Sequence, residues 1–343
     1  MLARRRSLTV ADVGEKYLIA HVIRPLFNPN NRLEGPGDDC AILSQTSEYA
    51  WLFTTDRVPA DLRAYKLQIL DSKGLGSYLA RLNLSDIAAC GGEPLGLLLN
   101  LGLPRHLPYR DFVGLCKGFL GVAKKHRCAI FGGDISDAAE LSISATAIGR
   151  VRRDRVLTRR GAKPGDTIFV SRPLGLTPAA FAYFQDRGRR TLRLNVPDVA
   201  VLARQFTSLA PMLSLGRRLG QSQACSSCMD NTDGISTSLH ELAEASGVAF
   251  VVNRRSLVFP DVVQQIADTL RMDVVKLALS AGADFSLVGT LRGSWDSRLV
   301  RAKLGRSVTC IGRVETGQGL YLETGRQRVP LPATGWNYFS QTD

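Results

Sequence analysis

Aspartates set among glycines and small hydroxyl residues recur along this chain of 343 residues. They occur in five motifs: Gly37-Asp38-Asp39, Thr54-Thr55-Asp56, Asn83-Leu84-Ser85-Asp86, Gly132-Gly133-Asp134 and Asp230-Asn231-Thr232-Asp233-Gly234. Carboxylates at strand ends and in glycine turns can approach a ligand closely and hold Mg²⁺ against a polyphosphate. Such dipeptides are also common in turns. Five motifs in one chain, three of them after apolar segments, nevertheless favour a nucleotide-dependent phosphoryl-transfer enzyme.

The length of the chain predicts two domains, because one hydrophobic core rarely serves so many residues. Hydrophobic residues make up 45% of the sequence, which is typical of a folded globular protein. The most apolar stretch, 95–103, is too short to cross a membrane and is expected to be a buried strand. The first residues, Met1 to Arg6, are not followed by the apolar core of a signal peptide, so we expect a cytoplasmic protein without a membrane segment.

A net charge of +13 predicts an anionic partner. The charge alone leaves nucleotide, phosphorylated substrate, RNA and acidic protein surface open. The basic residues form short clusters without the interleaved aromatic residues of RNA-binding motifs, so we do not expect a nucleic-acid partner. Most of them are interpreted as solvated surface, with one or two facing phosphate.

The seven cysteines include the pair Cys225 and Cys228, which has the spacing of a metal-binding knuckle. A zinc site would need a second pair, and none is nearby in the sequence. Reduced thiols are therefore the better interpretation.

Hydrophobic periodicity predicts alternating strands and helices in the first half of the chain. The predicted strands are 40–43, 51–55, 95–103, 128–131 and 141–147, and the predicted helices are 67–89 and 109–126. In the second half we expect strands at 167–171, 248–252, 285–291 and 308–314, and a helix at 236–246. The charged segment 150–166, with its glycine and proline residues, separates the halves. We therefore predict an α/β protein with domains at 1–152 and 153–343.

Several familiar phosphate sites are absent from the sequence. It contains no Gly-x-x-x-x-Gly-Lys loop, no Gly-x-Gly-x-x-Gly after the first strand and no protein-kinase motif pair. None of the four histidines adjoins an aspartate motif, which argues against a histidine base. Transfer to an acceptor that is already anionic needs no such base, and carboxylate-bound metal ions can do most of the work. The aspartates can bind two or more Mg²⁺.

Six segments together resemble the bacterial thiamine-monophosphate kinase family, of the aminoimidazole ribonucleotide (AIR) synthetase superfamily. They are Gly-Asp-Asp-Cys-Ala-Ile-Leu (37–43), Thr-Thr-Asp (54–56), Asn-Leu-Ser-Asp-Ile-Ala-Ala-Cys-Gly-Gly-Glu-Pro (83–94), Gly-Gly-Asp (132–134), Thr-Arg-Arg-Gly-Ala-Lys-Pro-Gly-Asp (158–166) and Asp-Asn-Thr-Asp-Gly (230–234). The resemblance runs in order from about Gly35 to Phe339. It implies a two-domain AIR-synthase-like α/β (α+β) fold, ATP and Mg²⁺ as cofactors, and a homodimer whose N-terminal mixed sheets pair into a barrel.

The resemblance also implies roles for individual residues. Metal ligands are implied at Asp39, Thr54, Thr55, Asp56, Asp86, Asp134, Asp230 and Asp233, with Asp38 shaping the turn. Nucleotide contacts are implied at Gly133, Asp134, Arg159 and Thr232, and catalytic roles at Asp86, Asp134 and Asp233. Trp336 keeps the place of an aromatic residue that stacks on the thiamine end of the substrate.

The departures from the family pattern gather at the acceptor end. Arg63 stands where the family has a substrate-contacting histidine, and Ala283 stands where it has a substrate-facing glutamate. Leu176 and Ser286 also differ from the family residues. The first hypothesis is therefore a kinase that converts thiamine phosphate to thiamine diphosphate. The alternatives are a paralogue that activates another phosphate, carboxylate or amide, and a non-catalytic nucleotide-binding protein.

Overall fold

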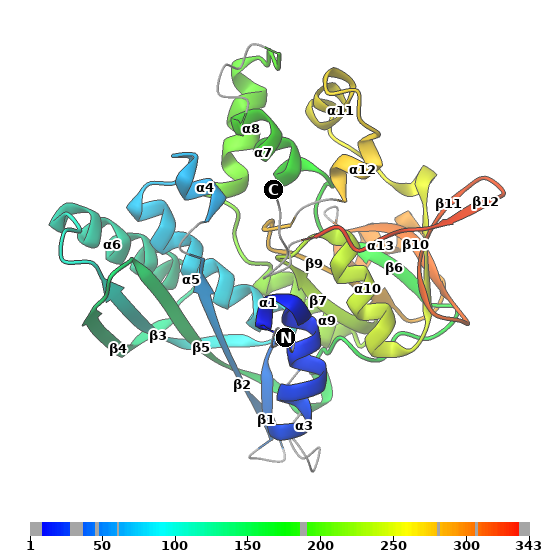
Figure 1. The fold of residues 1–343 in the computed structure, drawn as a ribbon. Helices are drawn as coiled ribbons and strands as arrows, with labels where there is room; N and C mark the ends of the chain where they lie inside the picture. Colours follow the sequence, from blue (N-terminus) through cyan, green and yellow to red (C-terminus); the bar gives the residue numbers. More distant parts are fainter. Residues whose placement is uncertain are drawn as a thin grey trace, which may run out of the picture.

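The fold is built on two β-sheets, each covered by helices (Figure 1). The computed structural model describes residues 9–27, 37–44, 48–59, 62–185, 191–279, 282–305 and 308–335. Within these ranges no helix is both long enough and apolar enough to cross a bilayer.

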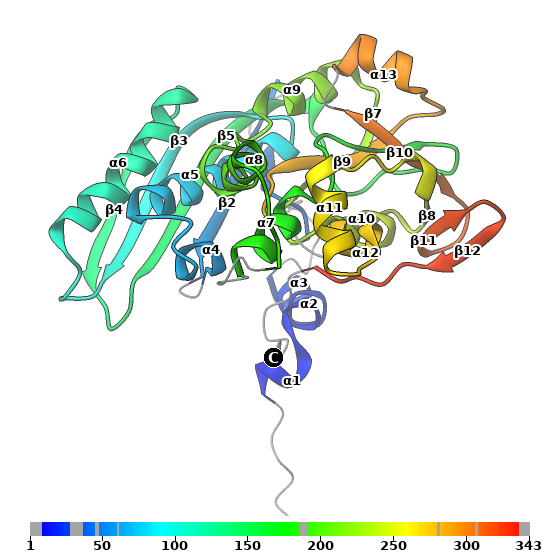
Figure 2. The same ribbon diagram turned by 90° about the horizontal axis from the view of Figure 1, so that it is seen from above.

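The first sheet has the strand order β1-β2-β5-β3-β4. Its strands are β1 Ala41–Ser44, β2 Tyr49–Val58, β3 Glu93–Leu103, β4 Ala129–Asp137 and β5 Ser142–Arg152. The pair β3 and β4 is parallel and the other pairs are antiparallel, so the sheet is mixed. The helices of this half are α4 Arg63–Lys66, α5 Ser72–Ala89 and α6 Tyr109–Lys125, and α5 and α6 cover one face of the sheet (Figure 2).

The strand β4 lies at the end of this sheet, and all nine of its residues are exposed in the single chain. Three of them are large apolar residues, Ile130, Phe131 and Ile135, which are 41%, 54% and 62% exposed. A strand edge with apolar side chains in water favours pairing with another chain.

The second sheet has the order β12-β11-β8-β10-β6-β9-β7. Its strands are β6 Thr167–Val170, β7 Cys225–Asn231, β8 Ala249–Asn253, β9 Ser286–Leu291, β10 Thr309–Glu315, β11 Gly319–Thr324 and β12 Gln327–Pro330. The helices of this half are α7 Leu176–Gln185, α8 Val196–Thr207, α9 Leu213–Ser222, α10 Ile235–Ser246, α11 Asp261–Thr269, α12 Val274–Ala278 and α13 Ser297–Leu304. Short helical turns η2 Arg153–Arg155 and η3 Arg254–Ser256 complete the described elements.

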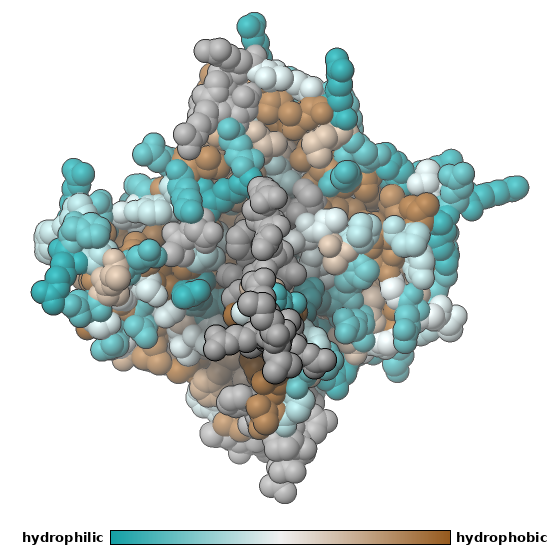
Figure 3. Space-filling model, viewed as in Figure 1, coloured by the Kyte–Doolittle hydropathy of each residue, from teal (hydrophilic) through white to brown (hydrophobic). Residues whose placement is uncertain are grey.

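A helical segment precedes the first sheet and consists of α1 Val10–Val13, α2 Glu15–Leu18, η1 Ile19–Ile23 and α3 Arg24–Phe27. It crosses the front of the molecule in Figure 1, close to the junction of the two halves. Five of its large apolar residues are 40% to 69% exposed: Val10, Tyr17, Val22, Ile23 and Leu26. Figure 3 shows hydrophobic surface at the lower centre of this face, where the segment lies.

Helix α5 positions the site, because it lies between the two sheets. Thirteen of its eighteen residues are buried, so apolar residues surround it on every side. It contacts β2, β3 and β5 of the first sheet and β7 and β9 of the second. One hydrophobic core includes residues of both halves, such as Leu52 and Phe285. The division at residue 152 therefore stays a prediction, although the two sheets fall on either side of it.

The predicted elements agree with the structure where periodicity was strong, as for β3, β5 and α6. The predicted helix 67–89 begins only at Ser72, because the side chain of Asp71 caps it by accepting a 2.7 Å hydrogen bond from the amide of Gly74. The predicted strand 128–131 ends too early. Gly132-Gly133-Asp134 continue β4, and a Cβ on Gly133 would lie 1.8 Å from the carbonyl oxygen of Leu99 on β3.

Candidate active site

Three buried carboxylates from distant parts of the chain meet at the junction of the two halves. Asp39 precedes β1, Asp86 lies in the last turn of α5, and Asp230 lies near the end of β7. Their side chains are at most 9% exposed, and one oxygen from each lies within 4.8 Å of the others. The structure thus brings together three of the sequence-predicted metal ligands.

Strand β2 adds two more predicted residues to this carboxylate cluster. The hydroxyl of Thr54 donates a 2.5 Å hydrogen bond to Oδ2 of Asp86. The amide of Asp56 donates to Oδ1 of Asn83, which lies one helical turn before Asp86. These two hydrogen bonds join β2 to the end of α5 at the cluster.

The side chain of Thr55 lies on the opposite face of β2, because successive residues of a strand alternate. Its hydroxyl donates to the carbonyl oxygen of Ala145 at 3.1 Å and accepts from the hydroxyl of Thr146. The hydroxyl of Thr55 therefore faces β5 and not the carboxylate cluster, and its role as a metal ligand stays a prediction.

Burial and mutual repulsion raise the pKa values of the clustered carboxyl groups. Burial raises the pKa of Asp86 well above its ordinary value, and the charges of Asp56, Asp230 and Asp39 add to the effect. The pKa of Asp230 is raised for the same reasons, first burial and then the charge of Asp39. The pKa of Asp56 rises to about 6, chiefly through burial. Without a cation, the cluster is an unfavourable collection of negative charge.

A divalent cation fits this cluster. Oδ2 of Asp39 and Oδ2 of Asp230 are buried and lack a hydrogen-bond partner, which is costly for carboxylate oxygens. Oxygens bound to one Mg²⁺ stand up to about 4.2 Å apart, since each metal–oxygen distance is about 2.1 Å. The separation of the three aspartate oxygens is close to that value.

Arg159 supplies the positive charge that the cluster contacts directly. Its Nη2 lies 2.6 Å and its Nε 3.1 Å from Oδ1 of Asp39, and its Nη1 lies 2.9 Å from Oε2 of Glu241. The backbone places Arg159 there, because the carbonyl oxygen of Thr158 accepts a hydrogen bond from the amide of Cys228 on β7. Burial alone would lower the pKa of Arg159, but Asp39 and Glu241 raise it overall.

Asp38 shapes the turn before β1, as the sequence predicted. Its carboxylate accepts hydrogen bonds from the amides of Asp39 and Arg159. Burial, followed by the charge of Asp39, raises the pKa of Asp38 to about 7. Asp38 thereby joins the turn before β1 to the backbone at Arg159.

The loop after β7 carries two further predicted residues. The hydroxyl of Thr232 donates to Oδ1 of Asp230 at 3.3 Å. Asp233 is half-buried, and its pKa rises to about 7, first through burial and then through the charges of Glu241 and Glu15. Asp233 therefore lies near Arg159 and its partner Glu241.

Ala283 lies against the same loop, because its amide donates a 2.8 Å hydrogen bond to the carbonyl oxygen of Thr232. Its φ of 66° is left-handed, as is that of Phe285 at 51°. Asp284, between them, holds this conformation by accepting hydrogen bonds from the amide and hydroxyl of Ser286 and from the side-chain amide of Asn231. The backbone of Ala283, a residue expected at the acceptor end, is thus bonded directly to the loop that follows Asp230.

Arg63 begins the short helix α4 and faces the other half of the molecule. Its guanidinium lies 5.4 Å from the centre of the Phe181 ring on α7, a cation–π contact. Trp336 lies outside the described residues. The structure therefore places one acceptor-end residue at the junction of the halves and another beside the Asp230 loop.

Gly133 and Asp134 do not join the cluster in the single chain. They lie on β4, and β5 and β3 separate β4 from β2. Asp134 pairs with Asn100 of β3, and its side chain is exposed. The expectation that Asp134 meets the other aspartates is wrong for one chain. The reason is that the Gly-Gly-Asp segment belongs to the edge strand β4.

Glu241 and Lys16 are site residues that the sequence interpretation missed. Nζ of Lys16 lies 2.9 Å from Oε1 of Glu241, which also binds Arg159. A signal for Glu241 was present, since Thr237 and Glu241 lie four residues apart on one face of α10, the helix that follows Asp233. No local pattern marks Lys16.

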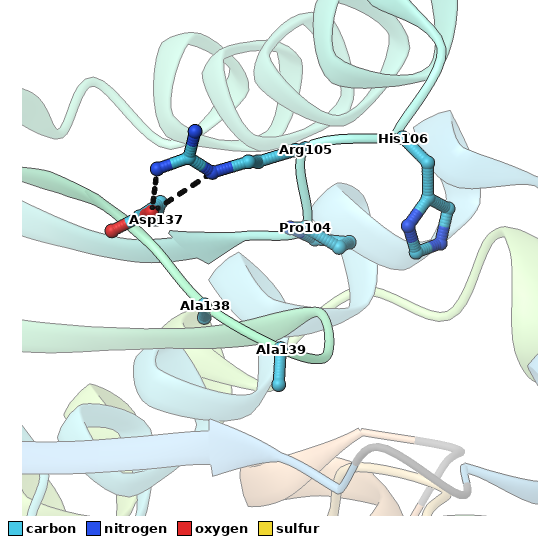
Figure 4. Close-up of a pocket in the computed structure, with 6 residues that line it drawn as sticks. All are labelled: Pro104, Arg105, His106, Asp137, Ala138 and Ala139. Atoms are coloured by element: carbon cyan, nitrogen blue, oxygen red, sulfur yellow. Dashed lines mark hydrogen bonds and ion pairs between the residues drawn. The ribbon is translucent and has the colours of Figure 1, made fainter.

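The described part of the chain also contains a shallow hollow at the far end of the first sheet (Figure 4). Arg105 and Asp137 form an exposed ion pair there, at 2.7 Å. This hollow is lined by Pro104, Arg105, His106, Asp137, Ala138 and Ala139 and includes no member of the carboxylate cluster.

The cysteines carry free thiols, and Cys225 and Cys228 are buried within β7. Among the described residues, the one group of three or more potential metal-binding side chains is that of Asp39, Asp86 and Asp230. The knuckle-like spacing therefore reflects a buried strand.

Residues 37–151 match the family model of the AIR synthase related protein, N-terminal domain. The thiamine-monophosphate kinase of Pyrococcus horikoshii is 29% identical over 313 residues, which span 90% of this chain and 92% of the relative. The crystal structure of thiamine-monophosphate kinase from Stenotrophomonas maltophilia is 27% identical with a TM-score of 0.70, and covers 89% of this chain and 95% of its own.

A further solved structure, AaThiL complexed with AMPPCP and TMP, shares the fold with a TM-score of 0.78 at 23% identity. The match covers 97% of this chain and 99% of that one. The two-sheet architecture and the ordered aspartate motifs agree with these likenesses. This chain is therefore similar to thiamine-monophosphate kinases over nearly its whole length, and it has the AIR-synthase-like fold.

Proposed function

We propose that this protein is an ATP-dependent phosphotransferase that converts thiamine phosphate and ATP to thiamine diphosphate and ADP. The observation that carries the proposal is the buried cluster of Asp39, Asp86 and Asp230 beside Arg159. Relatives named thiamine-monophosphate kinase match nearly the whole chain, and one structure of the same fold was solved with AMPPCP and TMP. Its cytoplasmic location stays a prediction.

The reaction needs no protein base. A phosphate oxygen of the acceptor forms a bond to the γ-phosphorus of ATP, and the bond between that phosphorus and the β–γ bridging oxygen breaks. At neutral pH the attacking oxygen already carries negative charge, so the protein must mainly position the two phosphates and offset their repulsion.

We propose Mg²⁺ as the metal and Asp39, Asp86 and Asp230 as its principal holders, with Asp56 and the Thr54 hydroxyl completing the site. When bound, Mg²⁺ neutralises charge on the phosphates. The two unpartnered oxygens, on Asp39 and Asp230, support this assignment. Arg159 and Thr232 are proposed to bind the nucleotide, and Asp233 to contribute from the loop after β7.

We propose a homodimer in which β4 lies at the interface. The exposed Ile130, Phe131 and Ile135 support this, and Gly133 and Asp134 would then face the partner copy. Ile135→Arg should convert the dimer to a monomer in sedimentation velocity and reduce turnover. Val258→Arg, at an equally exposed apolar residue of the other half, is the control. A wild-type monomer at micromolar concentration would overturn the proposal.

A second candidate function changes the acceptor and keeps the ATP site. Arg63 and Ala283 favour it, because an arginine and the loss of a glutamate make the acceptor end more positive. Thiamine phosphate carries a cationic thiazolium ring, which such a change disfavours electrostatically. A different phosphate, carboxylate or amide would then be activated.

The test is to incubate the purified protein with ATP and Mg²⁺, with and without thiamine phosphate, and to measure ADP and thiamine diphosphate. Equal amounts of both products, formed only with thiamine phosphate, support the first function and exclude the second and the non-catalytic alternative. ATP binding without turnover of thiamine phosphate would overturn the first. Asp86→Asn serves as the inactive control.

A further inference from the structure

Two cations from different parts of the chain share one carboxylate beside the carboxylate cluster. Nζ of Lys16 lies 2.9 Å from Oε1 of Glu241, and Nη1 of Arg159 lies 2.9 Å from Oε2 of the same residue. The ammonium and the guanidinium therefore lie on neighbouring oxygens of one planar anion. A phosphate group also offers adjacent oxygens and can accept two cations in this way.

These contacts continue from Glu241 through Arg159 to the carboxylate cluster. Arg159 contacts Asp39 at 2.6 Å, and Asp39 belongs to the carboxylate cluster. The charges of Glu241, Glu15, Arg159 and Lys16 act on the pKa of Asp233. Because Glu15 and Lys16 belong to α2, this helix lies beside the loop after β7. Figures 1 and 2 both show the N-terminal helices next to α10, which carries Glu241.

The charges around Lys16 and Arg159 allow both cations to change partners when a nucleotide binds. When the cluster binds a cation, that cation partly neutralises Asp39, and the ion pair between Asp39 and Arg159 weakens. Glu241 then contacts both cations, and a polyphosphate of three to four negative charges competes with it for them. The ammonium of Lys16 is half exposed, so it can change partners without leaving a buried charge unpaired.

We propose that Lys16 is a nucleotide-binding residue whose ammonium moves from Glu241 to the polyphosphate of bound ATP, so that segment 9–27 closes one side of the nucleotide site. Glu241 is a positioning residue that holds Lys16 and Arg159 beside the carboxylate cluster until the polyphosphate binds. The inference rests on the proposed ATP-dependent function, and it adds a segment that the sequence motifs did not include.

The test measures binding of Mg²⁺–AMPPCP and of AMP to the full-length protein by calorimetry. Lys16→Met should weaken AMPPCP binding about 5- to 20-fold and leave AMP binding within about twofold, because AMP lacks the outer phosphates. The salt dependence of AMPPCP binding should become shallower, since one phosphate contact is lost. Lys16→Arg should restore most of the affinity.

The matched control is Lys125→Met, at an exposed lysine in the last turn of α6, far from the cluster. It should leave both affinities unchanged. Lys16→Met should shift Tm by less than about 2 °C, because its ion pair is half exposed. Hydrogen exchange in residues 10–27 should slow with Mg²⁺–AMPPCP and not with AMP.

The outcomes separate this inference from the function on which it rests. If the wild type binds no AMPPCP, the proposed ATP-dependent function fails. If the wild type binds AMPPCP and Lys16→Met binds it equally well, the inference about Lys16 is wrong and the function stands. If Lys16→Met weakens AMPPCP and AMP alike, Lys16 only tethers the N-terminal segment, and the phosphate contact is refuted.

Discussion

Asp233 should destabilise the metal-free protein at neutral and alkaline pH, so Asp233→Asn should stabilise it. The carboxyl group is half-buried and faces Glu241 and Glu15. Burial, followed by these two charges, raises its pKa to about 7. Asparagine has nearly the same shape and carries no charge, so it removes the electrostatic cost and keeps the packing.

The sign follows from proton binding. Between pH 4 and pH 7 the folded protein holds a proton on Asp233 that the unfolded chain, with an ordinary aspartate pKa of about 3.9, releases. The free energy of unfolding of the wild type therefore falls as pH rises through this window, and it levels off above pH 7. A pKa of about 7 corresponds to a cost of up to about 4 kcal/mol. Partial exposure reduces this, and we expect about 2–3 kcal/mol.

The assay is urea unfolding of wild type and Asp233→Asn in EDTA, from pH 4 to pH 9. The difference in unfolding free energy should be near zero at pH 4 and reach its full value by pH 8. Asp137→Asn is the control, because that exposed carboxylate pairs with Arg105 and should contribute less than about 1 kcal/mol at any pH. A variant that is equally or less stable than wild type at pH 8 would refute the reasoning.

Three further predictions address catalysis, specificity and packing. Asp86→Asn should reduce Mg²⁺-dependent ADP formation at least about 100-fold, as loss of a charge-stabilising group at the phosphates commonly does, while circular dichroism shows an unchanged fold. Arg63→His combined with Ala283→Glu should raise kcat/KM for thiamine phosphate if these residues select another acceptor, and an unchanged value would dismiss that selection. Gly76→Ala should lower the free energy of unfolding by about 1–3 kcal/mol in urea titration, because its Cβ would lie 2.0 Å from the carbonyl oxygen of Leu115 on α6.

Local sequence signals predicted the parts of the fold that local physics determines. Alternating residues in β5 and helical periodicity in α6 place one face of each element against the core, and the structure agrees with both. The motif order placed Asp39, Asp86 and Asp230 in one site, because a site of this kind draws on strand and helix ends. The structure confirms that convergence.

Long-range pairing determined the parts that the sequence could not predict. Whether Gly132-Gly133-Asp134 turns or extends depends on β3, whose carbonyl at Leu99 leaves no room for a Cβ at Gly133. β7 was missed because its residues are mostly small or polar, and its burial comes from its neighbour β9 and from contacts with α5, α9 and α10. Lys16 meets Glu241 across 225 residues, and no short pattern encodes such a contact.

The separation of the proposed metal site from the proposed acceptor site explains how the residues of the second can change while those of the first stay constant. Asp39, Asp56 and Asp86 are held by β2, α5 and the turn before β1, whereas Arg63 lies on α4 and contacts α7. A substitution at Arg63 therefore leaves the hydrogen bonds of the cluster intact. Ala283 differs, since its amide binds the loop that carries Thr232. This contact uses the backbone, so the side chain at 283 can vary without loss of the bond, provided that the residue tolerates a φ of 66°. In the proposed reaction, acceptor specificity can thus change through side chains alone, while the backbone keeps the carboxylates in place for the nucleotide.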